Sequence, residues 1–330
     1  MCSFIDIDRT PTRCSEMVTR AINDESLMEP LTYTESLEYR GNYVARLIPL
    51  SEITSMKSRN LAEKKRWFRE LCNMLTADVD NEGYLEITVR REHLLKDSIE
   101  AIVNMSPEDM HKVWRIYFTG EEHRTPCDLA QEWFMLVMKQ LCEPRNGFWQ
   151  RNHKKDDGCS HINPLSNICC QNDLDYFHFM GRMIGKSLFD GMKVPNSIAP
   201  YIYKFMSGCP IKFTDLWQIL EEDNEVLGHL DRVDATGCCD LDMNMTELSP
   251  FEGIFHIDHI HNGRNIPVTR IGMSSYKQAL AKHLLYDTVE PQLTELLRGA
   301  FEVIPRSIYS IFHYDELQRL CGCNDFSHED

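Results

Sequence analysis

Long apolar runs are missing from this sequence. A membrane-spanning helix needs roughly 18–20 predominantly apolar residues, and no stretch of the chain approaches that length. The amino terminus reads Met-Cys-Ser-Phe-Ile-Asp-Ile-Asp, which is acidic and too briefly apolar for a secretory signal. We therefore expect a soluble, intracellular protein that is cytoplasmic, with the nucleus as an additional location.

Cysteine pairs with metal-binding spacing are missing as well. The chain has 13 cysteines, of which two pairs are adjacent, and a single glycine separates Cys321 from Cys323. A zinc knuckle usually separates its cysteines by two residues, so none of these pairs matches it. Because the count is odd and no secretory signal is recognised, we expect reduced thiols rather than a disulfide framework.

Four side chains of metal-ligating types are close in sequence: His256, Asp258, His259 and His261. In a strand, residues 256 and 259 point to opposite faces. The sequence therefore favours solvated histidines at a strand edge over a metal site. We predict neither a metal ion nor any other cofactor.

Positive charge is scarce. The sequence has 35 lysines and arginines against 51 aspartates and glutamates, which gives a net charge of −16. Such a chain repels phosphate backbones and attracts basic protein surfaces. We therefore exclude nucleic acid as a general partner.

The patterning that is present is mainly helical. Residues 1–57 show weak periodicity and scattered proline and threonine, and we interpret them as an irregular extension. From Ser58 onward, apolar residues recur at helical spacing. Helices are predicted over residues 61–75, 94–103, 129–142, 174–189, 198–206, 215–222, 274–301 and 315–320, and strands over 84–89, 113–118 and after 240. The predicted fold class is α+β, mainly helical with a few small sheets.

Gly181 and Gly185 lie about one turn apart on the helix predicted over residues 174–189. A glycine inside a helix costs roughly 1 kcal/mol relative to alanine. Two of them therefore predict that a neighbouring backbone approaches this helix closely.

Five short motifs occur in order along the chain. They are Ile-Thr-Val-Arg-Arg at 87–91 with Leu-Leu-Lys-Asp-Ser at 94–98; Ile-Tyr-Phe-Thr-Gly-Glu-Glu at 116–122 with Glu-Trp-Phe at 132–134; Ile-Asn-Pro at 162–164 with Tyr-Phe-x-Phe-x-Gly-Arg at 176–182; Asn-Gly-Arg-Asn-Ile-Pro-Val-Thr at 262–269; and a closing segment from Phe301 to Gly322. Together they resemble the amino-terminal lobe of HECT-type ubiquitin ligases. The resemblance implies such a lobe over residues 58–330. It would have a large helical subdomain and a small subdomain, about residues 203–268, that binds ubiquitin-conjugating enzymes.

The resemblance also implies where a conjugating enzyme docks, because the small subdomain of the family offers an apolar groove. The match places that groove at Val226, His229, Leu230, Val233, Asp240, Leu241, Met243 and Leu280. Val226, Leu230 and Val233 share one helix face. Periodicity alone favours an ordinary core for the apolar members. The resemblance favours a groove, because a small subdomain has little interior to fill.

Ubiquitin transfer in this family needs a cysteine thiolate that accepts ubiquitin from the thioester of a conjugating enzyme. That cysteine lies in a His-Thr-Cys-Phe setting within a further, carboxy-terminal lobe. None of the 13 cysteines here is preceded by threonine or followed by phenylalanine, and Cys127 near His123 lacks an arranged base. We therefore predict no catalytic residue in this chain and no ubiquitin transfer by it alone.

Three functions remain open at this point. The chain is a ligase-like protein, or pseudo-ligase, that docks conjugating enzymes; or it is a fragment or isoform of an active HECT ubiquitin-protein transferase; or it is an acidic protein-interaction scaffold. Substrate proteins are expected to bind, if at all, through residues 1–57. The sequence names neither the substrates nor the preferred conjugating enzyme.

Overall fold

The computed structural model describes residues 48–79, 84–121, 126–151, 160–193, 198–218, 246–248, 256–258, 265 and 273–322. The chain divides into two compact units. The small unit comprises residues 1–29 and 210–287, and the large unit comprises residues 30–209 and 288–330.

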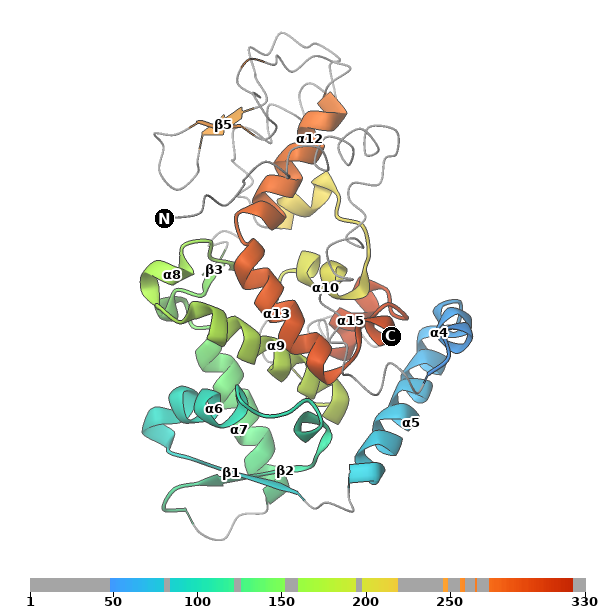
Figure 1. Ribbon diagram of the computed structural model, residues 1–330, viewed down its shortest axis with the longest axis vertical. Coiled ribbons are helices and arrows are strands. Elements are labelled where there is room, and N and C mark those ends of the chain that lie inside the picture. Colours follow the sequence, from blue (N-terminus) through green and yellow to red (C-terminus); the bar gives the residue numbers. More distant parts are fainter. Residues whose placement is uncertain are drawn as a thin grey trace, which may run out of the picture. The chain divides into compact units, whose positions relative to one another are not determined.

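Helices dominate the large unit (Figure 1). They are α4 (Leu50–Lys57), α5 (Leu61–Val79), α6 (Leu94–Ile102), α7 (Pro126–Leu141), α8 (Ser166–Cys169), α9 (Asp173–Asp190), α10 (Pro200–Ser207), α13 (Glu290–Val303), α14 (Arg306–Tyr309) and α15 (Tyr314–Leu320). Single-turn 3-10 helices lie between them: η3 (Arg91–His93), η4 (Asp109–His111) and η5 (Pro144–Asn146). The mainly helical fold class predicted from the sequence is confirmed. Among the helices that the structure describes, none combines the length and apolarity of a membrane crossing.

Two pairs of short strands complete the large unit: β1 (Leu85–Val89) with β2 (Trp114–Phe118), and β3 (Trp149–Arg151) with β4 (Ser160–Ile162). β1 and β2 are parallel, with Leu85 opposite Trp114. A parallel pair needs a crossover connection, which α6 and η4 supply here. β3 and β4 are antiparallel.

The described part of the small unit contains η6, a 3-10 helix (Phe213–Gln218), the antiparallel strands β5 (Thr246–Leu248) and β6 (His256–Asp258), α12 (Met273–Lys282) and the π-helical turn η8 (His283–Asp287). The prediction of one long helix over residues 274–301 is wrong. α12 ends at Lys282, and α13 starts anew at Glu290 with Pro291 in its first turn. Proline suits the first turn of a helix but removes a hydrogen bond from a helix interior, so Pro291 marks a new start.

α9 and α13 pack directly against each other in the large unit. A Cβ atom added at Gly181 of α9 would lie 1.9 Å from the carbonyl oxygen of Leu296. One added at Gly299 of α13 would lie 2.1 Å from the carbonyl oxygen of His178. Glycines from both helices therefore let the two backbones touch. The close approach predicted from Gly181 and Gly185 is confirmed, and α13 is the neighbour.

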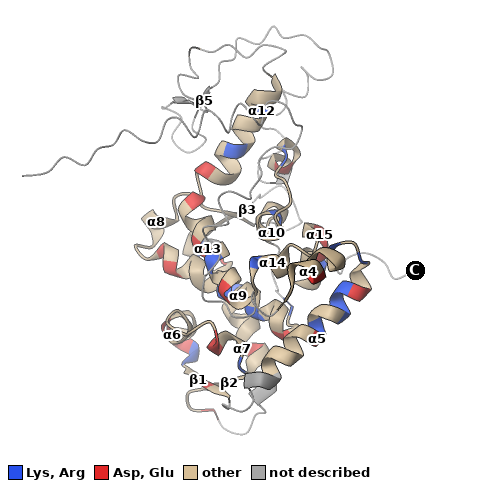
Figure 2. Cartoon of the chain, turned by 45° about the vertical axis from the view of Figure 1, so that its right-hand side comes forward, with Lys and Arg blue, Asp and Glu red and all other residues tan. Residues whose placement is uncertain are grey.

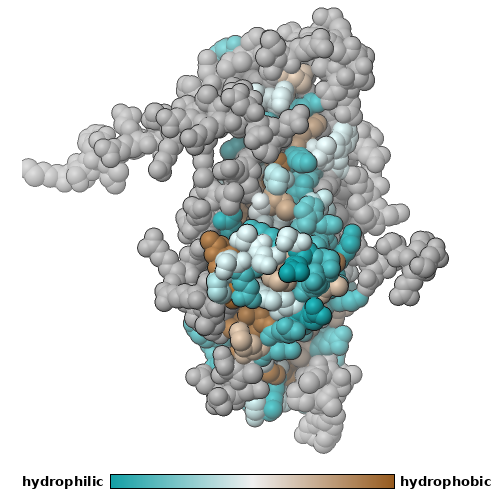
Figure 3. Space-filling view, turned by 90° about the vertical axis from the view of Figure 1, so that its right-hand side faces the viewer, coloured by the Kyte–Doolittle hydropathy of each residue, from teal (hydrophilic) through white to brown (hydrophobic). Residues whose placement is uncertain are grey.

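α4 and α5 lie on a face of the large unit that is mostly hydrophilic, with scattered apolar patches (Figure 3). Leu50 at the start of α4 is 76% exposed. α5 is tied to α15 by an ion pair, with 2.8 Å between Lys64 Nζ and Glu316 Oε2. Both of these side chains are mostly buried, so the pair is shielded from solvent.

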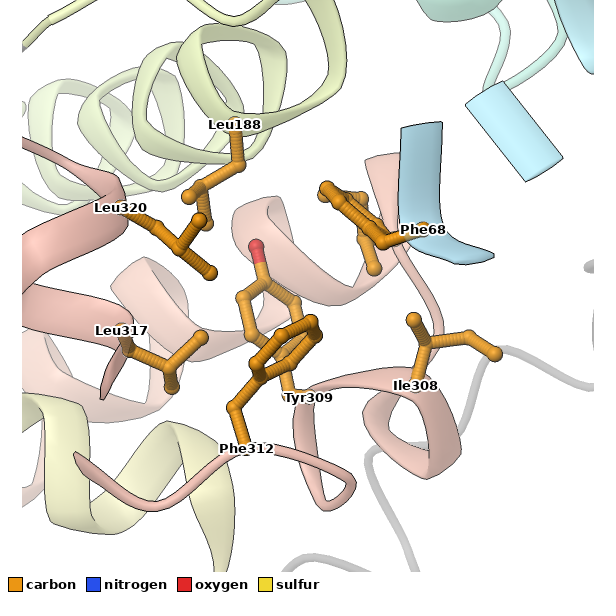
Figure 4. A pocket seen from close by; sticks show the side chains of 8 residues that line it. Phe68, Leu188, Ile308, Tyr309, Phe312, Leu317 and Leu320 are labelled. Atoms are coloured by element: carbon orange, nitrogen blue, oxygen red, sulfur yellow. The ribbon is translucent and has the colours of Figure 1, made fainter. Parts of the chain in front are cut away.

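A small apolar cavity lies where α5, α9, α14 and α15 meet (Figure 4). Its lining consists of Phe68, Leu188, Ile304, Ile308, Tyr309, Phe312, Leu317 and Leu320. The ring of Tyr309 stands among these side chains and directs its hydroxyl oxygen toward Leu188 (Figure 4). That hydroxyl is buried and forms no hydrogen bond with any described residue.

Candidate functional site

Most of the predicted docking groove lies outside the described residues. Seven of its members fall within residues 219–245, which the structure does not describe: Val226, His229, Leu230, Val233, Asp240, Leu241 and Met243. Leu280 is the member that can be placed, and its side chain on α12 is 0% exposed. The assignment of the groove therefore stays a prediction.

The framework beside Leu280 is visible in the small unit, where α12 packs against η6. Tyr276 and Leu280 of α12 and Leu216 of η6 are all buried. The carboxylate of Asp215 accepts a hydrogen bond from the backbone amide of Lys212 at 2.7 Å, which fixes the chain at the start of η6. Leu216, which is not one of the predicted groove residues, thus provides a reference for a core leucine of this unit.

The family motifs can be followed in the large unit, beginning with Asn163 of Ile-Asn-Pro. Its side-chain nitrogen donates to the carbonyl oxygen of Gly147 at 2.7 Å. Its side-chain oxygen accepts from the backbone amide of Leu165 at 3.1 Å and from the side chain of Gln150 at 3.2 Å. One amide group offers both donors and acceptors, which is why asparagine suits this position. The motif ties the β3–β4 hairpin to the start of α8.

Ser166 continues this connection into the helical core. Its hydroxyl donates to the carboxylate of Asp173 at 2.6 Å and accepts from the side-chain nitrogen of Gln292 at 3.1 Å. All three residues are buried. Because a buried polar group without a partner costs about 1–3 kcal/mol, these bonds join α8, α9 and α13 specifically.

Polar residues recur at four-residue spacing along α9, a helix that carries both basic and acidic segments (Figure 2). The row consists of His178, Arg182, Lys186 and Asp190. A spacing of four residues places side chains above one another on a helix. Sequence analysis missed this row, although constant spacing of polar residues on an otherwise apolar helix was the available signal.

Arg182 belongs to the Tyr-Phe-x-Phe-x-Gly-Arg motif and is bound on two sides. Its Nη2 lies 2.6 Å from Glu302 Oε2 on α13, and its Nη1 donates to the carbonyl oxygen of Ile102 at 2.5 Å. His178 Nε2 lies 2.9 Å from the same oxygen of Glu302. Burial opposes the charge of Glu302, but His178 and Arg182 outweigh it and lower the pKa of this carboxyl below its usual 4.5.

Lys186 is an amine with its side chain 1% exposed. Its Nζ donates to the carbonyl oxygen of Lys112 at 2.8 Å, pairs with Asp190 at 2.9 Å, and lies 4.9 Å from the ring centre of Trp114. Burial lowers the pKa of Lys186 and raises that of Asp190. The amine is engaged on every side, so its role is to hold α9 in place rather than to react.

Arg91 of the first motif holds the segment that follows β2. Its guanidinium pairs with Glu121 and, at 2.8 Å, with Glu132 of α7. It also lies 3.8 Å from the ring centre of Phe118. Gly120 has a φ of 83°, a left-handed conformation that glycine adopts without strain. The start of the Gly-Glu-Glu loop is therefore fixed by Arg91 and Gly120.

The described thiols differ in their exposure to solvent. Cys72, Cys142 and Cys321 are buried, Cys169 is exposed, and Cys170 and Cys209 are half-buried. Burial raises the pKa of the Cys72 thiol from 9.0 to about 12, so it stays protonated at neutral pH. A protonated thiol is a poor nucleophile. The described residues thus form an anchored scaffold, which agrees with the prediction of a docking protein but does not test it.

Comparison with known proteins decides the family. Residues 135–330 match the family model described as HECT-domain (ubiquitin-transferase). The chain belongs to the HECT family. The match covers more than half of the chain, and the residues that anchor α8, α9 and α13 to one another lie within it.

Three HECT relatives show how far the similarity extends. The mouse E3 ubiquitin-protein ligase HUWE1 is 29% identical over 269 residues, which is 78% of this chain and 6% of HUWE1. The Arabidopsis thaliana E3 ubiquitin-protein ligase UPL2 is 29% identical over 263 residues, which is 78% of this chain and 7% of UPL2. The rat E3 ubiquitin-protein ligase NEDD4 is 27% identical over 272 residues, which is 81% of this chain and 30% of NEDD4. The chain thus spans less than a third of each relative.

Proposed function

We propose that this HECT-family chain docks ubiquitin-conjugating enzymes through its small subdomain, about residues 203–268. Ubiquitin transfer then needs the family cysteine, whose Thr-Cys-Phe surroundings none of the 13 cysteines here has. The observation that carries the proposal is the HECT match over residues 135–330, which includes the whole segment of the predicted groove. The names of the relatives, all E3 ubiquitin-protein ligases, support a conjugating enzyme as the kind of partner.

In the proposed complex, an exposed aromatic side chain of the conjugating enzyme enters the groove between the Val226/Leu230 helix face and the Leu241/Met243 strand. Buried anchors of this kind dominate small interfaces, and truncating one typically costs about 1–3 kcal/mol. In this proposal Asp240 and His229 would be the polar members of the groove and would select among conjugating enzymes. The net charge of −16 favours a basic partner surface.

Calorimetric binding and thermal melts on the same variants test the groove. If Leu230 and Met243 line it, Leu230→Ala and Met243→Ala weaken binding roughly ten-fold or more and leave the melting temperature nearly unchanged. If they are core residues, the same changes cost about 2–5 kcal/mol of stability. Leu216→Ala, at a buried position of η6 outside the groove, is the control that shows the effect of losing a core side chain. Leu50→Ala, at a 76% exposed position, should change neither quantity. Normal affinity in well-folded Leu230→Ala and Met243→Ala proteins rejects the site.

The proposal also holds that this chain forms no ubiquitin thioester by itself. None of its 13 cysteines has the Thr-Cys-Phe surroundings of the family nucleophile. Incubation with a ubiquitin-charged conjugating enzyme, followed by gel electrophoresis with and without reductant, is the measurement. A reducible ubiquitin adduct on this chain contradicts the proposal.

A second candidate function is part of an active ubiquitin-protein transferase. This candidate is favoured because the chain covers only 6% to 30% of the length of these relatives. The coding sequence downstream distinguishes the two, because an active ligase requires a His-Thr-Cys-Phe-like motif there. The cytoplasmic location, with the nucleus in addition, is likewise proposed and is tested by imaging a fluorescent fusion of the full chain.

A further inference from the structure

His178 has two neighbours at one ring nitrogen that a single protonation state cannot satisfy. Glu295 Oε2 lies 3.2 Å from Nδ1, and Arg298 Nε lies 3.1 Å from the same nitrogen. A carboxylate accepts hydrogen bonds, so it needs a proton on Nδ1. A guanidinium only donates, so it needs a lone pair there. The two hydrogen bonds are therefore mutually exclusive.

The protonation state of His178 selects between them. In the neutral ring with its proton on Nε2, Nε2–H donates to Glu302 at 2.9 Å and Nδ1 accepts from Arg298. In the charged ring both nitrogens donate. Nε2–H then keeps Glu302, Nδ1–H donates to Glu295, and Arg298 Nε loses its acceptor.

We propose that His178 is a proton-operated switch at the α9–α13 interface, which binds Arg298 when neutral and Glu295 when charged. The two backbones already touch here and cannot move closer, since a Cβ at Gly299 would lie only 2.1 Å from the His178 carbonyl oxygen. The Arg298 side chain is 48% exposed and is the part that moves. Arg298 keeps its contact from Nη2 to Glu295 at 2.6 Å. Protonation of His178 at low pH therefore frees only the Nε edge of the Arg298 guanidinium.

The charges around His178 come from two helices. α13 contributes Glu295, Arg298 and Glu302, and α9 contributes Arg182 one turn away. α6, which also packs on α9, supplies backbone carbonyl oxygens that bind Arg182. Farther along α9, Lys186 and Asp190 pair with each other. Burial opposes the charged ring, but hydrogen bonds to Glu295 and Glu302 outweigh it and raise the pKa of His178 above 6.5.

Nitrogen NMR of the full chain labelled with ¹⁵N-histidine tests the switch. The His178 signal is assigned by its loss in His178→Gln, and the titration is followed across roughly pH 5 to 8. The neutral ring should carry its proton on Nε2. Arg298→Ala removes the donor that favours the neutral ring, so the titration midpoint should move to higher pH. Glu295→Gln removes the acceptor that favours the charged ring, so the midpoint should move to lower pH.

Matched controls separate these local effects from general changes of charge. Arg319→Ala and Glu100→Gln remove the same charges at positions that are 59% and 65% exposed on other helices, and should leave the midpoint unchanged. A neutral ring protonated on Nδ1 overturns the proposal. So does an unmoved or oppositely moved midpoint in either Arg298→Ala or Glu295→Gln. The tautomer is read from the unmodified chain once His178→Gln has assigned the signal, so this test holds even if Arg298→Ala or Glu295→Gln fails to fold.

Discussion

Glu302 of α13 and Arg182 of α9 form an ion pair at 2.6 Å in the interior of the large unit, where their side chains are 10% and 5% exposed. The two residues are 120 positions apart in sequence. Arg182 also donates to backbone carbonyl oxygens at the C-terminal end of α6, so the pair links three helices. Removing this ion pair should therefore lower the stability of the large unit as a whole.

Glu302→Gln should reduce the free energy of unfolding by about 3–5 kcal/mol at neutral pH, because Arg182 is left buried without a carboxylate. Urea denaturation measures the loss. Asp315→Asn is the matched control, since Asp315 is 40% exposed and pairs only at the surface. Exposed pairs contribute about 1 kcal/mol or less, so a similar loss in both variants would argue against the buried pair.

The contribution of Glu302 should also depend on pH. The folded protein holds the pKa of Glu302 below its usual 4.5, so the carboxylate stabilises the fold at pH values above 4.5. As pH falls through the lowered pKa, that stabilisation is lost. Below pH 4.5, where His178 is already charged, the difference in unfolding free energy between the unmodified chain and Glu302→Gln should therefore shrink on further acidification. A difference that grows as pH falls below 4.5 contradicts the assignment.

Gly181→Ala should destabilise the large unit by about 3 kcal/mol, because the new methyl group meets backbone that cannot rotate away. In an unconstrained helix the same change stabilises by roughly 1 kcal/mol. The sign of the change in unfolding free energy therefore shows whether the backbones of α9 and α13 touch at Gly181. Asn73→Ala, at an exposed position of α5, is the control. Its melting temperature should be unchanged or slightly raised, because alanine favours a helix more than asparagine does.

Tyr309→Phe should leave stability unchanged or raise it, because the hydroxyl that is removed is buried and has no partner. Tyr201→Phe is the counterpart, since the Tyr201 hydroxyl lies 2.8 Å from His161 Nδ1. It should lose about 1 kcal/mol. Equal losses in the two variants would show that the Tyr309 hydroxyl has a partner after all.

The sequence predicted well what depends on neighbouring residues along the chain. Apolar spacing predicted α9, and Gly181 predicted a close backbone. The partner of Gly181 could not be predicted, because α13 lies about a hundred residues further along the chain. For the same reason Arg182 gave no indication of Glu302. Pro291 was a readable signal for a new helix, and the prediction of one continuous helix overlooked it.

The groove rests on a different kind of inference. Leu230 and Met243 were placed by resemblance to the HECT lobe, since their spacing alone favours a core. Burial could distinguish these alternatives, but residues 219–245 lie outside the described ranges. Leu280 is buried, which fits both a core residue and the wall of a covered groove.

The order of the helices has a consequence for synthesis on the ribosome. α9 ends at Asp190, and α13 begins only at Glu290, with the whole described small unit between them. A growing chain therefore presents the glycine face of α9, with Arg182 beside it, before the helix that covers them exists. Exposed surfaces of this kind are prone to aggregate and are bound by chaperones. The large unit can close only when translation has nearly reached Gly322, so a ribosome that stalls inside the small unit leaves both units unfinished.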